Sequence, residues 1–385
     1  MFFLLATITA FTVGFLITPI LITFLKRMRL GDTPGGRKIH KVFIPSMGGV
    51  SFVAAVTVAL AIWGGQYPLP DIRYLLGAIC IMFVVGFRDD LVEMKATHKI
   101  LGQLIAVILV IGASDIRIKD FHGFLGIGEL NLYVSYLFSA FTLLALTNAF
   151  NLIDGLDGLA GTIASIVFSF LGAWFLYHDL DSYALISFTF LGGILAFLAF
   201  NWHPARIFMG DTGSLTLGFT MGALILAFME RNEALPAGSA WKFAPSFSAG
   251  VALMMFPLYD MGRVFMRRIS QGKGPMTPDR SHVHHFLMRM GLRHDKVTLL
   301  LASLQFAFIA LVFVFKDFSD NIVLPIITVT AIVLGLRLDS ITLKYVRKKV
   351  AVQPRVLEIK GLSSKQKAEL KLKTKEFMDS KLNLN

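Results

Sequence analysis

Cysteine and charged residues are both scarce in this sequence. The single cysteine, Cys80, lies within an apolar stretch, which excludes a disulfide framework and a metal site built on thiolates. Charged residues make up only 16% of the 385 residues, and the mean hydropathy is +0.67. These values exclude an ordinary soluble domain. The chain also has no zinc-finger spacing and no RNA-binding signature, so we expect no nucleic-acid partner.

Long apolar stretches take the place of charge. Hydrophobic residues make up 55% of the chain, and about eleven windows are long enough to cross the hydrocarbon core of a bilayer. Each window must be helical, because backbone groups in lipid need hydrogen-bond partners within the segment. The windows lie near residues 2–25, 47–64, 71–87, 99–113, 131–149, 158–177, 183–200, 213–229, 246–266, 297–315 and 321–337. The sequence therefore predicts an all-α integral membrane protein, a polytopic bundle of about 11 transmembrane helices.

Lysine and arginine are distributed unevenly between alternate loops. Of the 37 such residues, 31 fall on one side, in residues 26–43, 88–99, 148–158, 201–213, 263–297 and the tail from 337. By the positive-inside rule this side is cytoplasmic, which puts the N-terminus outside and the C-terminus in the cytoplasm. The net charge of +12 then reflects topology and contact with anionic lipid or phosphorylated ligands.

The composition changes once, near the C-terminus. No linker rich in serine, proline or glycine divides the apolar windows, so we treat residues 1–340 as one polytopic transmembrane domain that carries the catalytic candidates. From Ile341 onward the sequence is basic and polar. Residues 341–385 are therefore expected to form a basic cytoplasmic tail that rests on anionic headgroups.

The stretch "NAFNLIDGLDGLAG", residues 148–161, concentrates polar groups between apolar windows. Asn148, Asn151, Asp154 and Asp157 recur at every third residue, which on a helix would align them as a ridge along one face. The loop has no basic residue. Carboxylates without a cation are costly at membrane depth, so the stretch indicates a functional site rather than packing.

Two further loops on this side carry acids. "GFRDD" places Asp89 and Asp90 at the end of a window, where they are either a solvated helix end or a pair that binds a metal or accepts a proton. "FNWHPARIFMGDTGSL" places Asp211 at the start of the next window, either as a helix cap or as a Mg²⁺ ligand. In the same loop Asn201 and Phe208 could contact a base or simply pack.

Basic and imidazole groups occupy the remaining two loops. "GKGPMTPDRSHVHHFLMRMG" holds His282, His284 and His285 close to Arg280. The spacing lacks the HExxH pattern of zinc enzymes, so we favour a set of phosphate donors over a zinc site. In residues 26–43, glycines are interspersed with cations that include Lys41. This composition suits an anion but is also typical of any positive-inside loop.

Taken in order, these motifs resemble the polyprenyl-phosphate N-acetylhexosamine-1-phosphate transferases, integral membrane enzymes of bacterial envelope synthesis. The resemblance runs from "PSMGGV" through "GFRDD", "NAFNLIDGLDGLAG" and "HPARIFMGDTGSL" to "PDRSHVHHFLMRMG". The chain is most similar to the WecA and TagO branch, because "HVHH" replaces the three consecutive histidines of the MraY branch.

The resemblance implies a reaction, a location and partners. The enzyme would be a phosphotransferase that passes N-acetylglucosamine 1-phosphate, or a related N-acetylhexosamine 1-phosphate, from the UDP-sugar to undecaprenyl phosphate and releases UMP. It would act at the cytoplasmic face of the bacterial inner membrane and initiate an envelope glycopolymer, such as a teichoic acid or part of a lipopolysaccharide. Its partners would be UDP-GlcNAc, undecaprenyl phosphate, the lipid bilayer and, as a homodimer, a second copy of the chain.

Carried over position by position, the family pattern implies a role for each candidate residue. Asn151 and Asp211 would coordinate Mg²⁺, with Mn²⁺ as a substitute. The catalytic candidates are Asp89, Asp90, Asp154, Asp157, His282, His284 and His285. The candidates for substrate binding are Lys41, Lys99, Leu156, Asn201, Phe208 and Arg280. Among all of these, Asp157 would lie toward the uridine with Leu156, Asn201 and Phe208, and His284 and His285 would contact the diphosphate.

Several alternatives stay open at the level of sequence. The lipid phosphate could attack the donor directly, with Asp89 or Asp90 accepting its proton, or an aspartate could attack first and form a phosphoryl-enzyme. An enzyme like MraY, specific for phospho-MurNAc-pentapeptide, is a second reading. An ion-coupled transporter is a third, but it predicts acids spread through the interior of the spans. Apart from Asp260, the acids gather at the cytoplasmic ends, which favours an interfacial enzyme.

Overall fold

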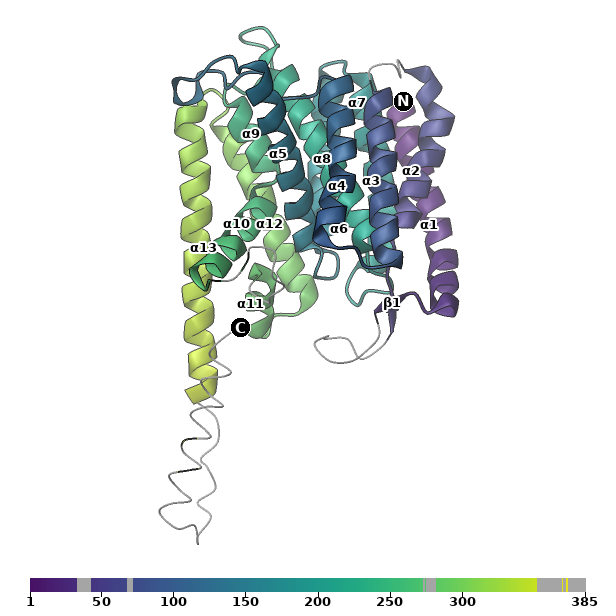
Figure 1. Ribbon diagram of the computed structural model, residues 1–385, viewed down its shortest axis with the longest axis vertical. Helices are drawn as coiled ribbons and strands as arrows, with labels where there is room; N and C mark the ends of the chain where they lie inside the picture. Colours follow the sequence, from purple (N-terminus) through teal and green to yellow (C-terminus); the bar gives the residue numbers. More distant parts are fainter. Residues whose placement is uncertain are drawn as a thin grey trace.

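Long helices run side by side through nearly the whole of the computed structural model (Figure 1). The structure describes residues 1–32, 43–67, 72–272, 274, 282–351, 369 and 372, and the side chains only to Tyr345 within the last helix. The α-helices are α1 Phe2–Met28, α2 Gly49–Trp63, α3 Arg73–Leu91, α4 Ala96–Ile108, α5 Leu132–Ile153, α6 Leu159–Tyr177, α7 Asp181–Asn201, α8 Gly210–Glu233, α9 Ser246–Leu253, α10 Met255–Ser270, α11 Val283–Arg289, α12 His294–Val314 and α13 Asp320–Ala351. Short 3-10 turns, η1 Gly64–Gln66 and η4 Phe124–Gly126, and a π-helical end to α4, η3 Leu109–Ala113, complete the helical elements. Two short strands, β1 Gly31–Asp32 and β2 Ile44–Pro45, pair antiparallel.

Nine helices of the described part are long and apolar enough to cross a membrane: α1, α2 with η1, α4 with η3, α5, α6, α7, α8, α12 and α13. An integral membrane protein built from helices, as the sequence predicts, is therefore confirmed at this level. The window predicted near 71–87 corresponds to α3, which carries charge at both of its ends, at Arg73 and at the Arg88 to Asp90 turn. The window near 246–266 is divided between α9 and α10.

The division of the window near 246–266 has a local cause. Pro257 has no N–H to donate to the carbonyl of Leu253, so a continuous helix would leave that carbonyl without its partner. Gln305 of α12 supplies the missing groups: its Nε2 donates to the carbonyls of Leu253 and of the preceding residue at 3.0 and 2.8 Å, and its Oε1 accepts from Phe256 N–H at 3.1 Å. The single helix predicted here is therefore wrong, since a side chain from another helix stabilises the break.

Helix α8 is the centre of the bundle. It packs against α3 and α5 on two sides, and also against α2, α6 and α9. Every residue of its 18-residue apolar window is buried inside the protein, whereas α1 and α13 have large exposed apolar faces. A helix that is apolar all round and enclosed by protein is typical of the core of a large bundle.

The N-terminal end of α8 lies unusually close to two neighbouring segments. A Cβ added at Gly86 of α3 would approach the carbonyl oxygen of Asp211 to 2.4 Å. Gly210 has φ +74°, a left-handed conformation that favours glycine. The backbone between β2 and α2 also hydrogen-bonds here, since Gly48 N–H donates to Phe208 O at 2.8 Å and Phe208 N–H donates to Pro45 O at 2.9 Å. This end of α8 is therefore held by backbone contacts from both sides.

The polar loops and the two strands lie at one end of the bundle, with α11, and the N-terminus lies at the other end (Figure 1). Helix α13 extends past the bundle at the polar end and continues to Ala351. The composition change at Ile341 thus falls within a helix. The proposed boundary between residues 340 and 341 stays a prediction.

Candidate active site

Asp211, in the first turn of α8, is the meeting point of four helices. Its Oδ2 accepts a hydrogen bond from Lys99 Nζ of α4 at 2.9 Å, and the same ammonium lies 2.9 Å from Asp89 Oδ2 of α3. Its Oδ1 accepts from Asn151 Nδ2 of α5 at 2.5 Å, and this amide also donates to Ser214 Oγ at 2.7 Å. The structure therefore brings together both predicted metal ligands, one of the paired aspartates and the predicted lysine.

The neighbouring Asp90 points elsewhere and caps α8. Its Oδ1 accepts from Asp211 N–H at 2.8 Å, and its Oδ2 accepts from Thr212 N–H at 2.8 Å and from Thr212 Oγ1 at 2.5 Å. These are the donors that a helix N-terminus leaves without intrahelical partners. The sequence allowed Asp211 to be the N-cap of this helix, but in the structure Asp90 of α3 caps it. The side chain of Asp211 is left to face the other groups of the cluster.

Asp154 follows directly after the last residue of α5 and faces the same cluster. Burial, together with the negative charges of Asp211 and Asp90, raises the pKa of Asp154 to about 8. Among the described residues, Asp89 and Asp211 share the single ammonium of Lys99, and Asp90 and Asp154 are close enough to interact with Asp211 through their charges. The excess of negative charge makes this a site for a cation.

The ridge predicted along residues 148–157 is only partly correct. Asn148 and Asn151 share one face of α5, but α5 ends at Ile153 and the chain then turns through glycines, with Gly158 at φ +75°. Asp157 therefore leaves the helix face on which the first two residues lie. The C-cap of α5 is Asp154, whose backbone has left the helical conformation (ψ +53°), and Gly158 is the N-cap of the next helix, α6. Residues 154–158 are therefore a turn between two helices, and this is the physical reason for the correction.

Asn148 lies one turn deeper than Asn151 and joins α5 to α4. Its Nδ2 donates to Gln103 Oε1 at 2.8 Å and to Leu144 O at 2.8 Å. Gln103 is fully buried and lies one turn after Lys99 on α4. This amide pair fixes the two helices that present Lys99 and Asn151 to Asp211.

Asp157 is buried and binds two histidines that the sequence did not single out. Its Oδ2 lies 2.7 Å from His203 Nδ1 and 3.4 Å from His294 Nδ1, and it accepts from Ala205 N–H at 3.3 Å. Burial by itself would raise the pKa of Asp157, but hydrogen bonds from His294 and His203 lower it to about 2. The carboxylate is therefore ionised at neutral pH.

The residues expected near the uridine take different positions. Asn201 is buried and donates through Nδ2 to Ile207 O at 2.9 Å, while its Oδ1 accepts from Gly158 N–H at 2.9 Å. Leu156 is buried in the apolar core. Phe208 is partly exposed, so its ring is the one among these that a ligand can reach.

The predicted histidines begin the short helix α11. His282 Nδ1 lies 2.8 Å from Asp260 Oδ2, and Asp260 Oδ1 accepts from Val283 N–H at 2.8 Å. Asp260 is fully buried, so it orients the start of α11. The acid that the sequence left unexplained in the interior of a window therefore belongs to the histidine motif.

His284 is the most enclosed of the three histidines, with 1% of its surface exposed. A Cβ added at Gly155 would lie 3.1 Å from its Nε2, which places the ring against the loop that carries Asp154. Burial, together with the charge of His285, lowers the pKa of His284 to about 3. The ring is therefore neutral, while His285, whose ring centroid is 4.3 Å away, is partly exposed.

Two predicted residues cannot be assigned a position. Lys41 and Arg280 lie outside the described residues. Motif reasoning missed Asp260, His203, His294, Gln103 and Ser214. Only His203 and Ser214, in "FNWHPARIFMGDTGSL", lie within a stretch that the sequence had already marked.

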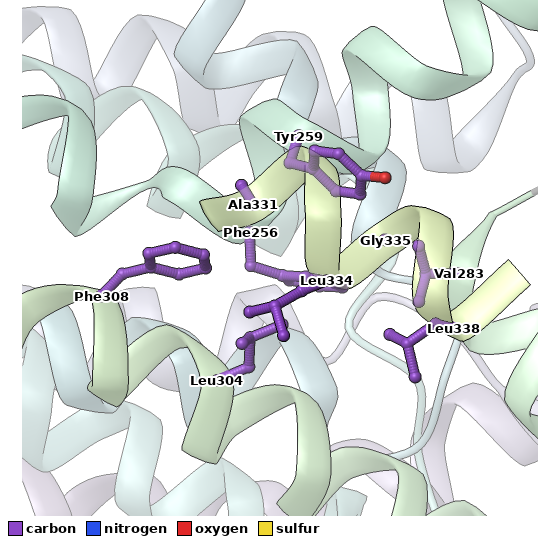
Figure 2. A pocket seen from close by; sticks show the side chains of 9 residues that line it. All are labelled: Phe256, Tyr259, Val283, Leu304, Phe308, Ala331, Leu334, Gly335 and Leu338. Carbon is purple, nitrogen blue, oxygen red and sulfur yellow. The ribbon is translucent and has the colours of Figure 1, made fainter. Parts of the chain in front are cut away.

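An apolar crevice lies near the histidine helix. Figure 2 shows its lining, which comes from α10, α12 and α13 and includes Phe256, Phe308 and Leu334, with Val283 of α11 at one side. Tyr259 packs its hydroxyl against the backbone of Gly335. The lining offers no charged group, and the cavity volume is only about 10 Å³, so the crevice is a small apolar gap between the helices.

Comparison with known proteins gives consistent matches. Residues 72–229 match the family described as glycosyl transferase family 4. The chain is 31% identical over 309 residues to the probable undecaprenyl-phosphate N-acetylglucosaminyl 1-phosphate transferase of Bacillus subtilis strain 168, across 78% of this chain and 82% of that protein. It is 29% identical to the undecaprenyl-phosphate alpha-N-acetylglucosaminyl 1-phosphate transferase of Yersinia pestis, across 74% of this chain and 77% of that protein. The enzyme of that name from Escherichia coli strain K12 is 27% identical, across 76% of this chain and 78% of that protein.

Proposed function

Because the chain belongs to glycosyl transferase family 4, we propose that it is a phosphotransferase that moves N-acetylglucosamine 1-phosphate from UDP-GlcNAc to undecaprenyl phosphate and releases UMP. The names of its relatives state the acceptor and the sugar phosphate. The observation that carries the proposal is the cluster in which Asp211 contacts Asn151 and Lys99, with Asp89 on the same ammonium.

The cluster fits Mg²⁺, with Mn²⁺ as a substitute. Mg²⁺ prefers hard oxygen ligands and keeps positions for water and phosphate oxygens. Asp211 and Asn151 would hold the ion, and the surplus of carboxylates over cations in the described part of the site favours it electrostatically. When bound, the ion would offset the repulsion between two anionic substrates and stabilise charge on the departing UMP.

Asp89 and Asp90 would have different roles in the reaction. Asp90 accepts three hydrogen bonds at the N-terminus of α8, so we assign it the positioning of Asp211. Asp89 accepts from Met94 N–H at 2.6 Å and from Lys99, and it would accept a proton from the lipid phosphate where that phosphate carries one. Lys99, between Asp89 and Asp211, would also hold a phosphate oxygen.

We favour a single displacement. An oxygen of the lipid phosphate bonds to the β-phosphorus, the bond from that phosphorus to the bridging oxygen breaks, and UMP leaves with the electron pair. This route needs fewer groups in position than attack by an aspartate followed by a second transfer. With an isotopically chiral β-phosphorus, inversion is expected, and retention would point to a phosphoryl-enzyme.

The neutral His284 against the Asp154 loop, and His285 beside it, would contact the diphosphate. Phe208 would stack on the uracil, with Leu156 and Asn201 shaping the floor beneath it. The nucleotide contact of Asp157 and the roles of Lys41 and Arg280 stay predictions.

The site would face the cytoplasm of a bacterial inner membrane. The nine candidate spans, together with α3 and the broken pair α9 and α10, would make eleven crossings with the N-terminus outside. This assignment rests on the sequence, in which 31 of the 37 basic residues fall in the loops predicted on one side of the membrane. A homodimer stays a prediction that native mass spectrometry can test.

The decisive experiment measures transfer of labelled sugar phosphate by the purified protein. With Mg²⁺, UDP-GlcNAc and undecaprenyl phosphate, we expect a labelled lipid and one UMP for each product. A lipid product from UDP-GalNAc or another UDP-hexosamine, with none from UDP-GlcNAc, would change the sugar and keep the reaction class. UDP-MurNAc-pentapeptide as the sole donor would support the MraY-like alternative, and no lipid product from any donor would refute a transferase.

The transporter alternative has little support. It predicts ionisable groups along the interior of the spans, yet the internal Asp260 is paired with His282 of the histidine helix. The named relatives are transferases.

A further inference from the structure

Three donor atoms from separate segments meet at Asp157. Its Oδ2 lies 2.7 Å from Nδ1 of His203 and 3.4 Å from Nδ1 of His294, and the three donor atoms all lie within 4.8 Å of one another. Asp157 follows α5, His203 precedes α8, and His294 is the first residue of α12. The imidazole rings lie face to face, with centroids 4.7 Å apart.

The chemistry of these donors differs from that of the Asp211 cluster. Two imidazole nitrogens and one carboxylate oxygen form a set that suits Zn²⁺ and similar transition-metal ions, whereas Mg²⁺ prefers oxygen alone. In a tetrahedral zinc site with bonds of about 2.0–2.1 Å, neighbouring ligand atoms lie about 3.3 Å apart. The observed separations of 2.7 and 3.4 Å are on either side of that value. An ion would replace the hydrogen bond between His203 and Asp157, and the two stacked rings would turn so that both Nδ1 atoms face it.

Neighbouring groups hold Asp157 in place, as outer-shell partners do in metal sites. Thr298 Oγ1 donates to the backbone carbonyl of Asp157 at 2.8 Å, and Ala205 N–H donates to its Oδ2 at 3.3 Å. The side chain of Asp157 is 4% exposed, while those of His203 and His294 are 28% and 17% exposed. The carboxylate is thus fixed, while each imidazole ring keeps an edge exposed to solvent.

We propose that Asp157, His203 and His294 bind one Zn²⁺ ion, at a site separate from the Mg²⁺ expected at Asp211. The ion would have three protein ligands and an open position. It would join the segment after α5, the segment before α8 and the start of α12. The proposal rests on the geometry of these residues and does not depend on the identity of the transferred sugar.

The test uses the full-length protein in detergent after removal of metals by a chelator. Equilibrium dialysis against Zn²⁺ in excess Mg²⁺, followed by metal analysis, is expected to give one Zn²⁺ per chain and a higher melting temperature. His203→Gln and His294→Gln should each weaken binding about tenfold or more. Glutamine keeps a hydrogen-bond donor for Asp157, so the variants are expected to fold, and their melting temperatures without metal check this.

Two variants serve as matched controls. His98→Gln removes an exposed histidine elsewhere on the polar end, and Asp211→Asn alters the oxygen cluster, and both should bind Zn²⁺ as the unchanged chain does. The visible absorption of bound Co²⁺ gives a second readout, because tetrahedral coordination produces intense bands. The proposal is wrong if the unchanged chain binds no Zn²⁺ or shows no such bands, or if both histidine variants keep full affinity because the α11 histidines hold the ion.

Discussion

Asp211 is the residue on which most contacts of the candidate site depend. It joins Lys99 of α4 and Asn151 of α5 through side-chain hydrogen bonds. Asp211→Asn keeps the size of the side chain but removes the charge that a metal ligand needs. We expect kcat to fall about a hundredfold or more and the dependence on Mg²⁺ to weaken, as measured by transfer rates across a Mg²⁺ titration.

Asp317→Asn is the matched control for that change. Asp317 is exposed and pairs only with the neighbouring Lys316 in the described structure, so its loss should leave turnover and Mg²⁺ dependence unaltered. If Asp211→Asn behaved like this control, Asp211 would not belong to the metal site.

His284 gives the protein a specific dependence of stability on pH. Its pKa is lowered from 6.5 to about 3 by burial, so between these values the unfolded chain binds a proton that the folded chain does not. The stabilisation is therefore complete above about pH 6.5 and is lost as the pH falls, by up to about 1.4 kcal/mol per pH unit.

The variant His284→Gln isolates this effect. Between pH 7 and pH 5 its melting temperature should fall less than that of the unchanged chain, whereas His98→Gln should behave as the unchanged chain does. If the melting temperatures of all three proteins fell equally between pH 7 and pH 5, His284 would be charged in the folded protein.

At the scale of residues, the sequence predicts which residues belong to the site. It does not predict the different positions of two residues that are adjacent in the chain. Asp89, Lys99, Asn151 and Asp211 could be identified from their motifs. The different tasks of Asp89 and Asp90 could not, because successive residues of a helix point about 100° apart. Which one meets α8 depends on how α3 is rotated against it.

Among the elements, the contact between α3 and α8 depends on Gly86. A methyl group there would lie 2.4 Å from the backbone oxygen of Asp211, and backbone cannot move aside as a flexible side chain can. We expect Gly86→Ala to destabilise the fold by about 1–3 kcal/mol and to reduce transfer activity, measured by thermal unfolding and by initial rates.

Gly262→Ala on α10 is the matched control, because no atom lies within 4 Å of the position its Cβ would take. Alanine favours a helix over glycine, so this variant should be as stable as the unchanged chain or slightly more stable. A harmless Gly86→Ala would show that the close approach of α3 to α8 is not needed.

The bounds of most elements follow from apolar windows, since length and hydropathy are local properties. The break between α9 and α10 does not, because it depends on Gln305, more than forty residues later in the chain. The course of residues 154–158 was also missed. The three-residue spacing was taken as one helical face, but α5 ends before Asp154 and the chain turns into α6 at Gly158.

For the whole molecule, the charge bias predicts an orientation that chemical labelling can check. With Cys80 replaced by serine, we expect Ala237→Cys, after α8, to react with a membrane-impermeant thiol reagent in right-side-out vesicles. Lys95→Cys, after α3, should react only in inverted vesicles. Both positions are exposed, and the opposite pattern of labelling would reverse the assigned topology.

The membrane class and the family could be recognised from the sequence, and the comparisons confirm the family. The arrangement of the bundle could not be predicted. All apolar windows look alike in composition, and which of them is surrounded by protein depends on long-range packing.

The enclosure of α8 also separates the reaction from the physical state of the bilayer. No residue of its apolar window reaches lipid, so the depth of Asp211 is set by protein neighbours. Bilayers of different thickness would be accommodated by tilting of the outer helices, at a modest cost per ångström. Turnover in vesicles should therefore vary little with acyl-chain length at a fixed surface density of lipid acceptor. The outer helices and the bilayer would deform, and the geometry of the active site would stay the same.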